Sequence, residues 1–176
     1  MLITVLLLAL GAVALWFVIA ATRPDQFQVT RNAVIKAPAP KIFALIDDLR
    51  SFNNWSHFEK KDPSAKGQYS GAASGVGAAY SWQGRKVGAG RMEITTSEAP
   101  RKLTMRLDFT KPFKVQNTAE FTLLPHGESL TVVSWTLRGP SPYLAKLMGV
   151  VIDMDALIGK DFEAGLANLK ALTEGR

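Results

Sequence analysis

The chain has 176 residues, enough for one domain with a hydrophobic core. It has no cysteine and only two histidines, which excludes disulfides, thiolate metal sites and a cysteine nucleophile and disfavours a multi-histidine metal site. The net charge is +6, but the basic residues are scattered along the chain, so the sequence indicates no nucleic-acid surface.

Residues 1–22, MLITVLLLALGAVALWFVIAAT, carry no charged side chain. As a helix at ~1.5 Å per residue they would extend about 33 Å, and the hydrocarbon core of a bilayer is ~30 Å thick. A cleaved signal peptide is the alternative, but it would begin with basic residues and have an apolar run of only ~7–15 residues. We therefore predict an uncleaved, single-pass transmembrane anchor.

Arg23 and Arg31 follow this segment and no basic residue precedes it, which favours the cytoplasmic side of the membrane for the rest of the chain. Two arginines are a narrow basis, because a large domain can be exported despite them, so the side stays open. Residues 23–27 form a short linker, and we expect a single domain over residues 28–176.

The domain begins with a strand-like, β-branched run at 27–37, followed by helical spacing of apolar residues over 38–49. Residues 50–66 are polar with interspersed aromatic residues, as in a short helix or loop that covers an apolar surface. Strands are then predicted over 77–83, 88–99, 101–109, 113–125 and 128–139, joined by turns of a few residues. Such short connections predict an antiparallel meander with one apolar face.

From residue 143 to the C-terminus, apolar residues recur at steps of three or four and predict one long helix with a single apolar stripe. Gly149, Gly159 and Gly165 lie inside this pattern, and each costs about 1 kcal/mol relative to alanine in a helix interior. We expect these glycines to mark either a kink or a close approach of the helix to the sheet.

The stretch 70–91, SGAASGVGAAYSWQGRKVGAGR, contains six glycines and could be read as a phosphate-binding loop. A dinucleotide fingerprint requires a helix directly after the glycines, and the residues that follow here are strand-like. Glycine within strands instead marks a bulge, a bend or a close backbone approach. We therefore predict a bent sheet rather than a phosphate site.

The inward-facing residues of this sheet, with those of the segment that covers it and of the last helix, are candidates for a ligand pocket. They are mostly apolar, as pockets for hydrophobic ligands are, and Asn117 is the one amide among them. An ordinary packed core, in which Asn117 satisfies a buried backbone group, is the alternative. The candidate lining is Trp55, Tyr80, Trp82, Met92, Met105, Phe109, Asn117, Phe121 and Trp135, facing Leu147, Val151 and Met154.

Other chemistry has little support in the sequence. His57 is close in sequence to acidic residues, but nothing positions it as a general base, and His126 is expected in an exposed turn. The acidic residues of the last helix diverge at helical spacing and are expected on a solvated face with Lys160 and Lys170 as partners. We predict no catalytic residue, no metal and no cofactor.

The order of these elements, and several motifs, resemble the START-like or SRPBCC superfamily, in particular its bacterial polyketide cyclase/dehydrase-like branch. The motifs are IKAPAPKIF, SGVGAAYSWQGRKVGAGRMEI and MDALIGKDFEAGLANLK, and the resemblance covers residues 28–173. It implies a helix-grip fold, an α+β architecture in which a curved antiparallel sheet grips a long C-terminal helix. Many bacterial members also have an N-terminal anchor.

The superfamily includes carriers, receptors and enzymes, so membership alone does not define a function. Our first expectation is a membrane-anchored protein that binds a small hydrophobic or lipid-like ligand between the sheet and the last helix. A cyclase or dehydratase, in which His57, Tyr80 or Asn117 assists proton movement, is the second. The third is a non-catalytic interaction module of a membrane complex, with an exposed apolar patch at residues 140–152.

Overall fold

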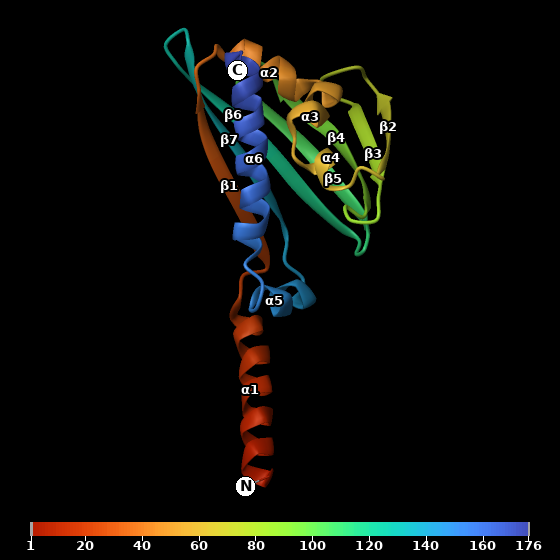
Figure 1. The fold of residues 1–176 in the computed structure, drawn as a ribbon, viewed down its shortest axis with the longest axis vertical. Coiled ribbons are helices and arrows are strands. Elements are labelled where there is room, and N and C mark those ends of the chain that lie inside the picture. Colours follow the sequence, from red (N-terminus) through yellow and green to blue (C-terminus); the bar gives the residue numbers. More distant parts are fainter. Residues whose placement is uncertain (1, 176) are drawn as a thin grey trace.

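The computed structural model describes residues 2–175 and shows a curved antiparallel sheet, a long C-terminal helix against it and a protruding N-terminal helix (Figure 1). The sheet has seven strands in the order β1-β7-β6-β5-β4-β3-β2. The predicted fold class, a sheet that grips a C-terminal helix, is confirmed. In chain order the elements are α1 (Leu2–Thr22), β1 (Gln26–Ile35), α2 (Ala39–Asp47), α3 (Leu49–Trp55), α4 (Phe58–Lys61), β2 (Lys66–Gly71), β3 (Ala78–Gln83), β4 (Ala89–Glu98), β5 (Lys102–Lys111), β6 (Val115–His126), β7 (Leu130–Pro140), α5 (Tyr143–Gly149) and α6 (Met154–Glu174).

The strand register brings one end of every strand to the side from which α1 leaves. Gln26 pairs with Pro140, so that β1 begins where β7 ends. Phe109 pairs with Val115, so that β5 ends where β6 begins. We call this the α1-side end of the sheet; it holds the first residues of β1, β4 and β6 and the last residues of β3, β5 and β7.

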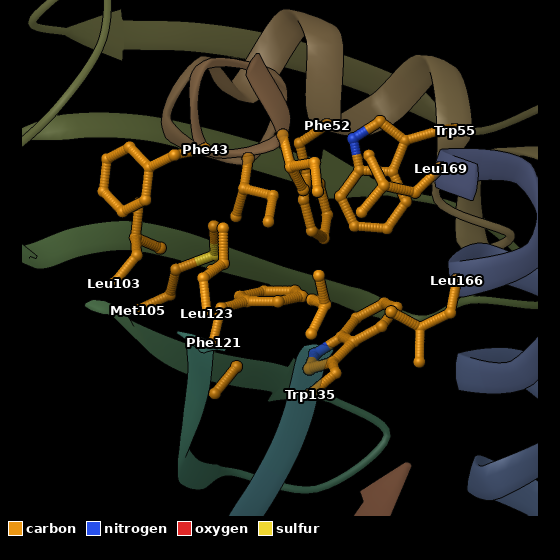
Figure 2. Packing of buried hydrophobic residues seen from close by; sticks show 14 of the residues in the cluster. Phe43, Phe52, Trp55, Leu103, Met105, Phe121, Leu123, Trp135, Leu166 and Leu169 are labelled. Carbon is orange, nitrogen blue, oxygen red and sulfur yellow. The ribbon is translucent and has the colours of Figure 1, made fainter. Parts of the chain in front are cut away.

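The hydrophobic core fills the other end of the concave face. There α2, α3 and α6 cover the sheet, and aromatic and aliphatic side chains from these helices and the strands form one hydrophobic cluster (Figure 2). The indole of Trp135 in β7 stacks on Phe162 of α6, with ring centroids 4.0 Å apart and planes 5° from parallel. Trp55 of α3 contacts the same indole edge-on, at 5.6 Å. The sheet and α6 are therefore closely interlocked at this end.

Two glycines of α6 allow this close approach. A Cβ atom at Gly165 would lie 2.9 Å from Cζ3 of Trp135, which is closer than real Cβ contacts. At Gly159, an added Cβ would collide with the guanidinium of Arg31 in β1, which pairs with Asp155 and Glu163 at 2.8 Å each. Of the two expectations for these glycines, close approach to the sheet is the correct one.

The prediction of a single helix from residue 143 onward is wrong. The chain forms α5 and then α6, separated by residues 150–153, and Asp153 caps α6 by accepting a hydrogen bond from the N–H of Ala156 at 2.9 Å. The apolar stripe continues through both helices, but α5 packs against α1 and not against the sheet. The spacing of apolar residues is the same in both helices, so it could not show that α5 packs against α1 whereas α6 packs against the sheet.

The helix α1 extends away from the domain and buries only Ala20 among its described residues (Figure 1). Its last turns contact α5, where the Tyr143 hydroxyl donates to the Phe17 carbonyl oxygen at 3.1 Å. By length and apolar composition α1 can cross a membrane, a property that signal sequences share.

Candidate functional site

The concave face of the sheet is closed at the core end. Four of the predicted lining residues belong to this closed part, and each is at most 2% exposed. Their side chains contact one another or neighbouring core residues, so that they pack the interior (Figure 2). These four residues are Trp55, Met105, Phe121 and Trp135.

Toward the α1-side end the concave face becomes accessible. Figure 1 shows no helix over the ends of β4, β5 and β6 there, and several large apolar side chains of these strands and their neighbours are only partly buried. We call this region the open half of the concave face. It consists of Phe27, Trp82, Gly90, Leu107, Phe109, Val115, Asn117, Leu137 and Gly139.

An aromatic pair holds a fixed geometry in the open half. The rings of Trp82 and Phe109 meet edge to face, with centroids 5.5 Å apart and planes at 78°. The indole N–H of Trp82 donates to the Val87 carbonyl oxygen at 3.2 Å, which orients the ring. Gly90 of the adjacent strand makes room for it, because a Cβ there would lie 2.6 Å from Cζ2 of Trp82. The pair thus offers a preformed apolar wall.

Asn117 is the polar group of this region. It is 7% exposed, and its Oδ1 atom is buried with no hydrogen-bond partner among the described residues. The side chain lies over Gly139 of β7, where any Cβ would collide with Oδ1. A buried acceptor without a partner costs about 1–3 kcal/mol, so Asn117 is suited to accept a hydrogen bond from a bound molecule.

The other predicted lining residues lie elsewhere. Tyr80 and Met92 are buried in the core cluster, and the Tyr80 ring packs on Tyr69 with centroids 4.7 Å apart. The placement of three residues opposite the sheet is corrected, because the α5–α6 break takes them away from it: Leu147 is in α5, Val151 is 78% exposed and Met154 is 41% exposed. Six residues of the open half were not in the predicted lining, although the alternation along the strands gives Leu107 the inward parity of Phe109 and Val115 that of Asn117. They are Phe27, Gly90, Leu107, Val115, Leu137 and Gly139.

The polar candidates are not assembled into a reactive group. His57 is half-buried at the start of α4, and His126 is exposed. The acidic residues of α6 pair differently from the expectation: Asp161 pairs with Lys61. Asp155 and Glu163 pair with Arg31, and Lys170 pairs with Glu174. Among the side chains that the structure describes, which are those of residues 2–58 and 61–175, no three from His, Asp or Glu come together as a metal site.

Two surface hollows, of about 280 and 330 Å³, lie outside the concave face. The first is lined by residues of α3, β2 and β3, including Arg50 and Tyr69. The second lies at the other end of β2, between Lys66 and Arg85. Both are at the β2 edge of the sheet, and the second is lined by Gln83 and Gly84, which follow Trp82 of the open half.

The family model for polyketide cyclase / dehydrase and lipid transport matches residues 26–174, and the chain belongs to this family. This places it in the SRPBCC superfamily. No curated protein matches the chain.

Solved structures share the fold at low sequence identity. Norcoclaurine synthase from Thalictrum flavum, in complex with dopamine and hydroxybenzaldehyde, is 12% identical with a TM-score of 0.62, covering 90% of this chain and 92% of that one. A Chromobacterium violaceum protein is 15% identical with a TM-score of 0.59, covering 86% and 99%. The Aha1 dimer from Colwellia psychrerythraea is 16% identical with a TM-score of 0.59, covering 84% and 96%.

Proposed function

We propose that this protein is a membrane-anchored binding protein for a small, mostly apolar molecule that carries one hydrogen-bond donor. The molecule lies on the open half of the concave face, against Trp82 and Phe109. The observation that carries the proposal is the Oδ1 atom of Asn117, which is buried without a partner over Gly139, on the same face of the sheet as these partly exposed rings. A hydroxyl or N–H group on the ligand would satisfy this atom.

The residue composition of the open half favours ligand binding over catalysis. None of its nine residues is ionisable, and a cyclase or dehydratase needs a positioned acid or base beside its substrate. The membrane part of the proposal rests on α1, whose apolar residues are almost all exposed. Ligands that concentrate in lipid would reach the site over a short distance.

The likeness to norcoclaurine synthase supports the ligand class. Dopamine and hydroxybenzaldehyde, which that enzyme holds, are small aromatic molecules with hydroxyl donors. The wall formed by Trp82 and Phe109 offers aromatic contacts of the same kind, which are worth about 0.5–1.5 kcal/mol for a well-placed ring pair beyond the burial of area.

Native mass spectrometry of the detergent-extracted full-length protein tests the proposal. The probes are N-phenylnaphthylamine, an apolar aromatic amine with one N–H donor, and phenylnaphthalene, an apolar aromatic hydrocarbon of similar size that has no donor. We expect the wild-type protein to bind both and to prefer the amine. The variant Asn117→Leu should weaken binding of the amine about tenfold, or ~1.4 kcal/mol, and leave phenylnaphthalene unaffected.

Asn32→Leu is the matched control, because Asn32 is an exposed amide of β1 outside the open half. This variant should bind both probes as the wild-type protein does. Absence of binding by the wild-type protein, or an equal loss of both probes in Asn117→Leu, would contradict the proposed site.

A further inference from the structure

An apolar surface surrounds α5 and the start of α6. Its large side chains are between 42% and 78% exposed, although apolar patches of this extent are uncommon on soluble monomers. None of them contributes to the core cluster of the sheet. We call this the α5 surface, and it consists of Tyr143, Leu144, Met148, Val151, Ile152 and Leu157.

The α5 surface is free of exposed charge over eleven consecutive residues. Within 142–152 the only charged residue is Lys146, and its side chain is folded inward, with the residue 8% exposed. Its Nζ atom pairs with Oδ1 of Asp25 at 2.6 Å, directly beyond the end of α1. The ion pair compensates the charge of Lys146. The Asp25 side chain is itself 95% exposed, and the guanidinium of Arg23 lies near Gly149, so charges border the α5 surface at the end of α1.

The packing of α5 against α1 places this surface beside the apolar helix. Tyr143 donates to the carbonyl oxygen of Phe17, which lies five residues before the end of α1, about 7.5 Å along its axis. Trp16 is the neighbouring residue, and its ring is tilted by 57° against that of Phe17, with centroids 5.5 Å apart. Tryptophan and tyrosine at one level of a membrane helix are typical of the layer between lipid tails and water.

We propose that the α5 surface lies within the interfacial layer of the same bilayer that α1 crosses. This inference rests on the proposed anchor and adds that the domain is docked on the lipid surface in one orientation. The bilayer is the partner that would cover this surface, because the α5 surface adjoins the apolar helix α1 and has no exposed charged residue between Tyr143 and Ile152. Such a helix lies flat, with its apolar side toward the acyl chains.

A second contact point lies on the same side of the domain. The turn between β5 and β6 carries Phe113, which is 60% exposed, between Lys111 and Lys114. The register places this turn at the α1-side end of the sheet, and Figure 1 shows it pointing toward the end from which α1 leaves. An exposed aromatic ring with flanking lysines fits an interface with anionic headgroups.

Site-directed spin labelling of the full chain tests this docking, and the absence of native cysteine makes single-cysteine variants straightforward. The variants Val151→Cys, Leu10→Cys and Leu124→Cys are labelled with a nitroxide and reconstituted in vesicles of phosphatidylcholine and phosphatidylglycerol. Leu10 reports on α1, and Leu124 is the matched control, because it is an exposed apolar residue at the end of β6 farthest from α1. Relaxation by oxygen, which concentrates in lipid, is compared with relaxation by a water-soluble nickel complex.

We expect the labels at Val151 and Leu10 to be more accessible to oxygen than to nickel, and the label at Leu124 to show the reverse. A lipid-exposed Leu10 with a water-exposed Val151 would overturn the docking and leave the anchor intact. A Val151 label that neither reagent reaches would also overturn it, because a protein partner would then cover the surface. A water-exposed Leu10 would overturn the anchor and the docking together, whereas ligand binding is measured independently through Asn117.

Discussion

Large side chains in this protein lie across neighbouring strands wherever a glycine leaves room for them. Gly90 lies beneath Trp82 and Gly139 beneath Asn117, so two glycines shape the open half of the concave face. Gly165 has the same role for the core, where α6 meets the indole of Trp135. Within the glycine-rich stretch 70–91, Gly90 is therefore explained by packing against Trp82. Gly71, Gly75, Gly77 and Gly88 have φ between 67° and 87°, a left-handed conformation that favours glycine, so backbone conformation rather than phosphate binding explains them.

The two glycines of α6 should respond differently to alanine. In Gly165→Ala the new Cβ meets the edge of Trp135, which cannot move because it is stacked on Phe162. Overpacking of about 1–3 kcal/mol exceeds the ~1 kcal/mol gained in helix propensity, so the free energy of unfolding should fall by about 1 kcal/mol. Urea denaturation followed by tryptophan fluorescence measures this change.

Gly159→Ala is the control for that measurement. Here the new Cβ meets the end of the Arg31 side chain, which is flexible and can move into solvent. The exposed ion pairs that it loosens contribute little, and alanine favours the helix, so stability should be unchanged or slightly higher. Equal stability of Gly165→Ala and the wild-type protein would show that α6 does not press on the core as described.

At the scale of secondary-structure elements, Asp62 links the turn after α4 to the loop between β3 and β4 through hydrogen bonds. Its carboxylate accepts hydrogen bonds from the hydroxyl of Ser64 at 2.6 Å and from the backbone N–H of Lys86 at 2.7 Å. The Ser64 hydroxyl, followed by the Lys86 N–H, lowers the pKa of Asp62 from 3.8 to about 2. The ionised form is therefore the one that the folded protein stabilises.

This lowered pKa predicts a pH-dependent contribution to stability. Because the folded protein holds the proton less tightly than the unfolded chain, the contribution is complete above about pH 4 and is lost as the pH falls toward 2. Asp62→Asn should lower the Tm at pH 6, and its deficit should shrink progressively at pH values below 4. Circular dichroism in detergent measures both curves, with Glu128→Gln in the exposed β6–β7 turn as a charge-matched control. A deficit that does not change with pH would contradict the role of the carboxylate.

Strands were the elements most accessible to prediction. Apolar and polar residues alternate in β5, β6 and β7 because each of these strands has one buried and one solvated face. The sequence analysis predicted the bounds of these three strands to within a few residues. The C-terminal helix was predicted as one element because α5 is apolar for a different reason from α6. Contact with α1 and the exposed α5 surface account for the apolar residues of α5, and sequence periodicity does not reveal which surroundings an apolar side chain will have.

The candidate site could be predicted only in part for a related reason. The alternation of side chains along the strands correctly predicted that Trp82, Phe109 and Asn117 lie on the concave face. It also directed Phe121 and Trp135 to this face, and Trp55 was expected in the segment that covers it, yet all three residues are packed in the core. The difference depends on where α2, α3 and α6 cross the sheet, which is set by long-range packing and not by the strands.

For the whole molecule, the anchor predicts a retained N-terminus. The proposed function requires that residues 1–22 stay attached, so protein extracted from membranes should have the full mass of 19.2 kDa, and a carbonate wash should not release it. Intact mass spectrometry distinguishes this product from a signal-peptide product, which would begin near residue 23. A shortened, soluble product would contradict the anchor.

Only Arg23, Pro24 and Asp25 separate α1 from β1. Three extended residues reach about 10 Å at most, less than the width of the domain that they hold. With α1 in a bilayer, the domain would search for its ligand in two dimensions, along the plane of one membrane. It could then pass that ligand to neighbours in the same membrane, and it could not shuttle cargo through water to a distant one.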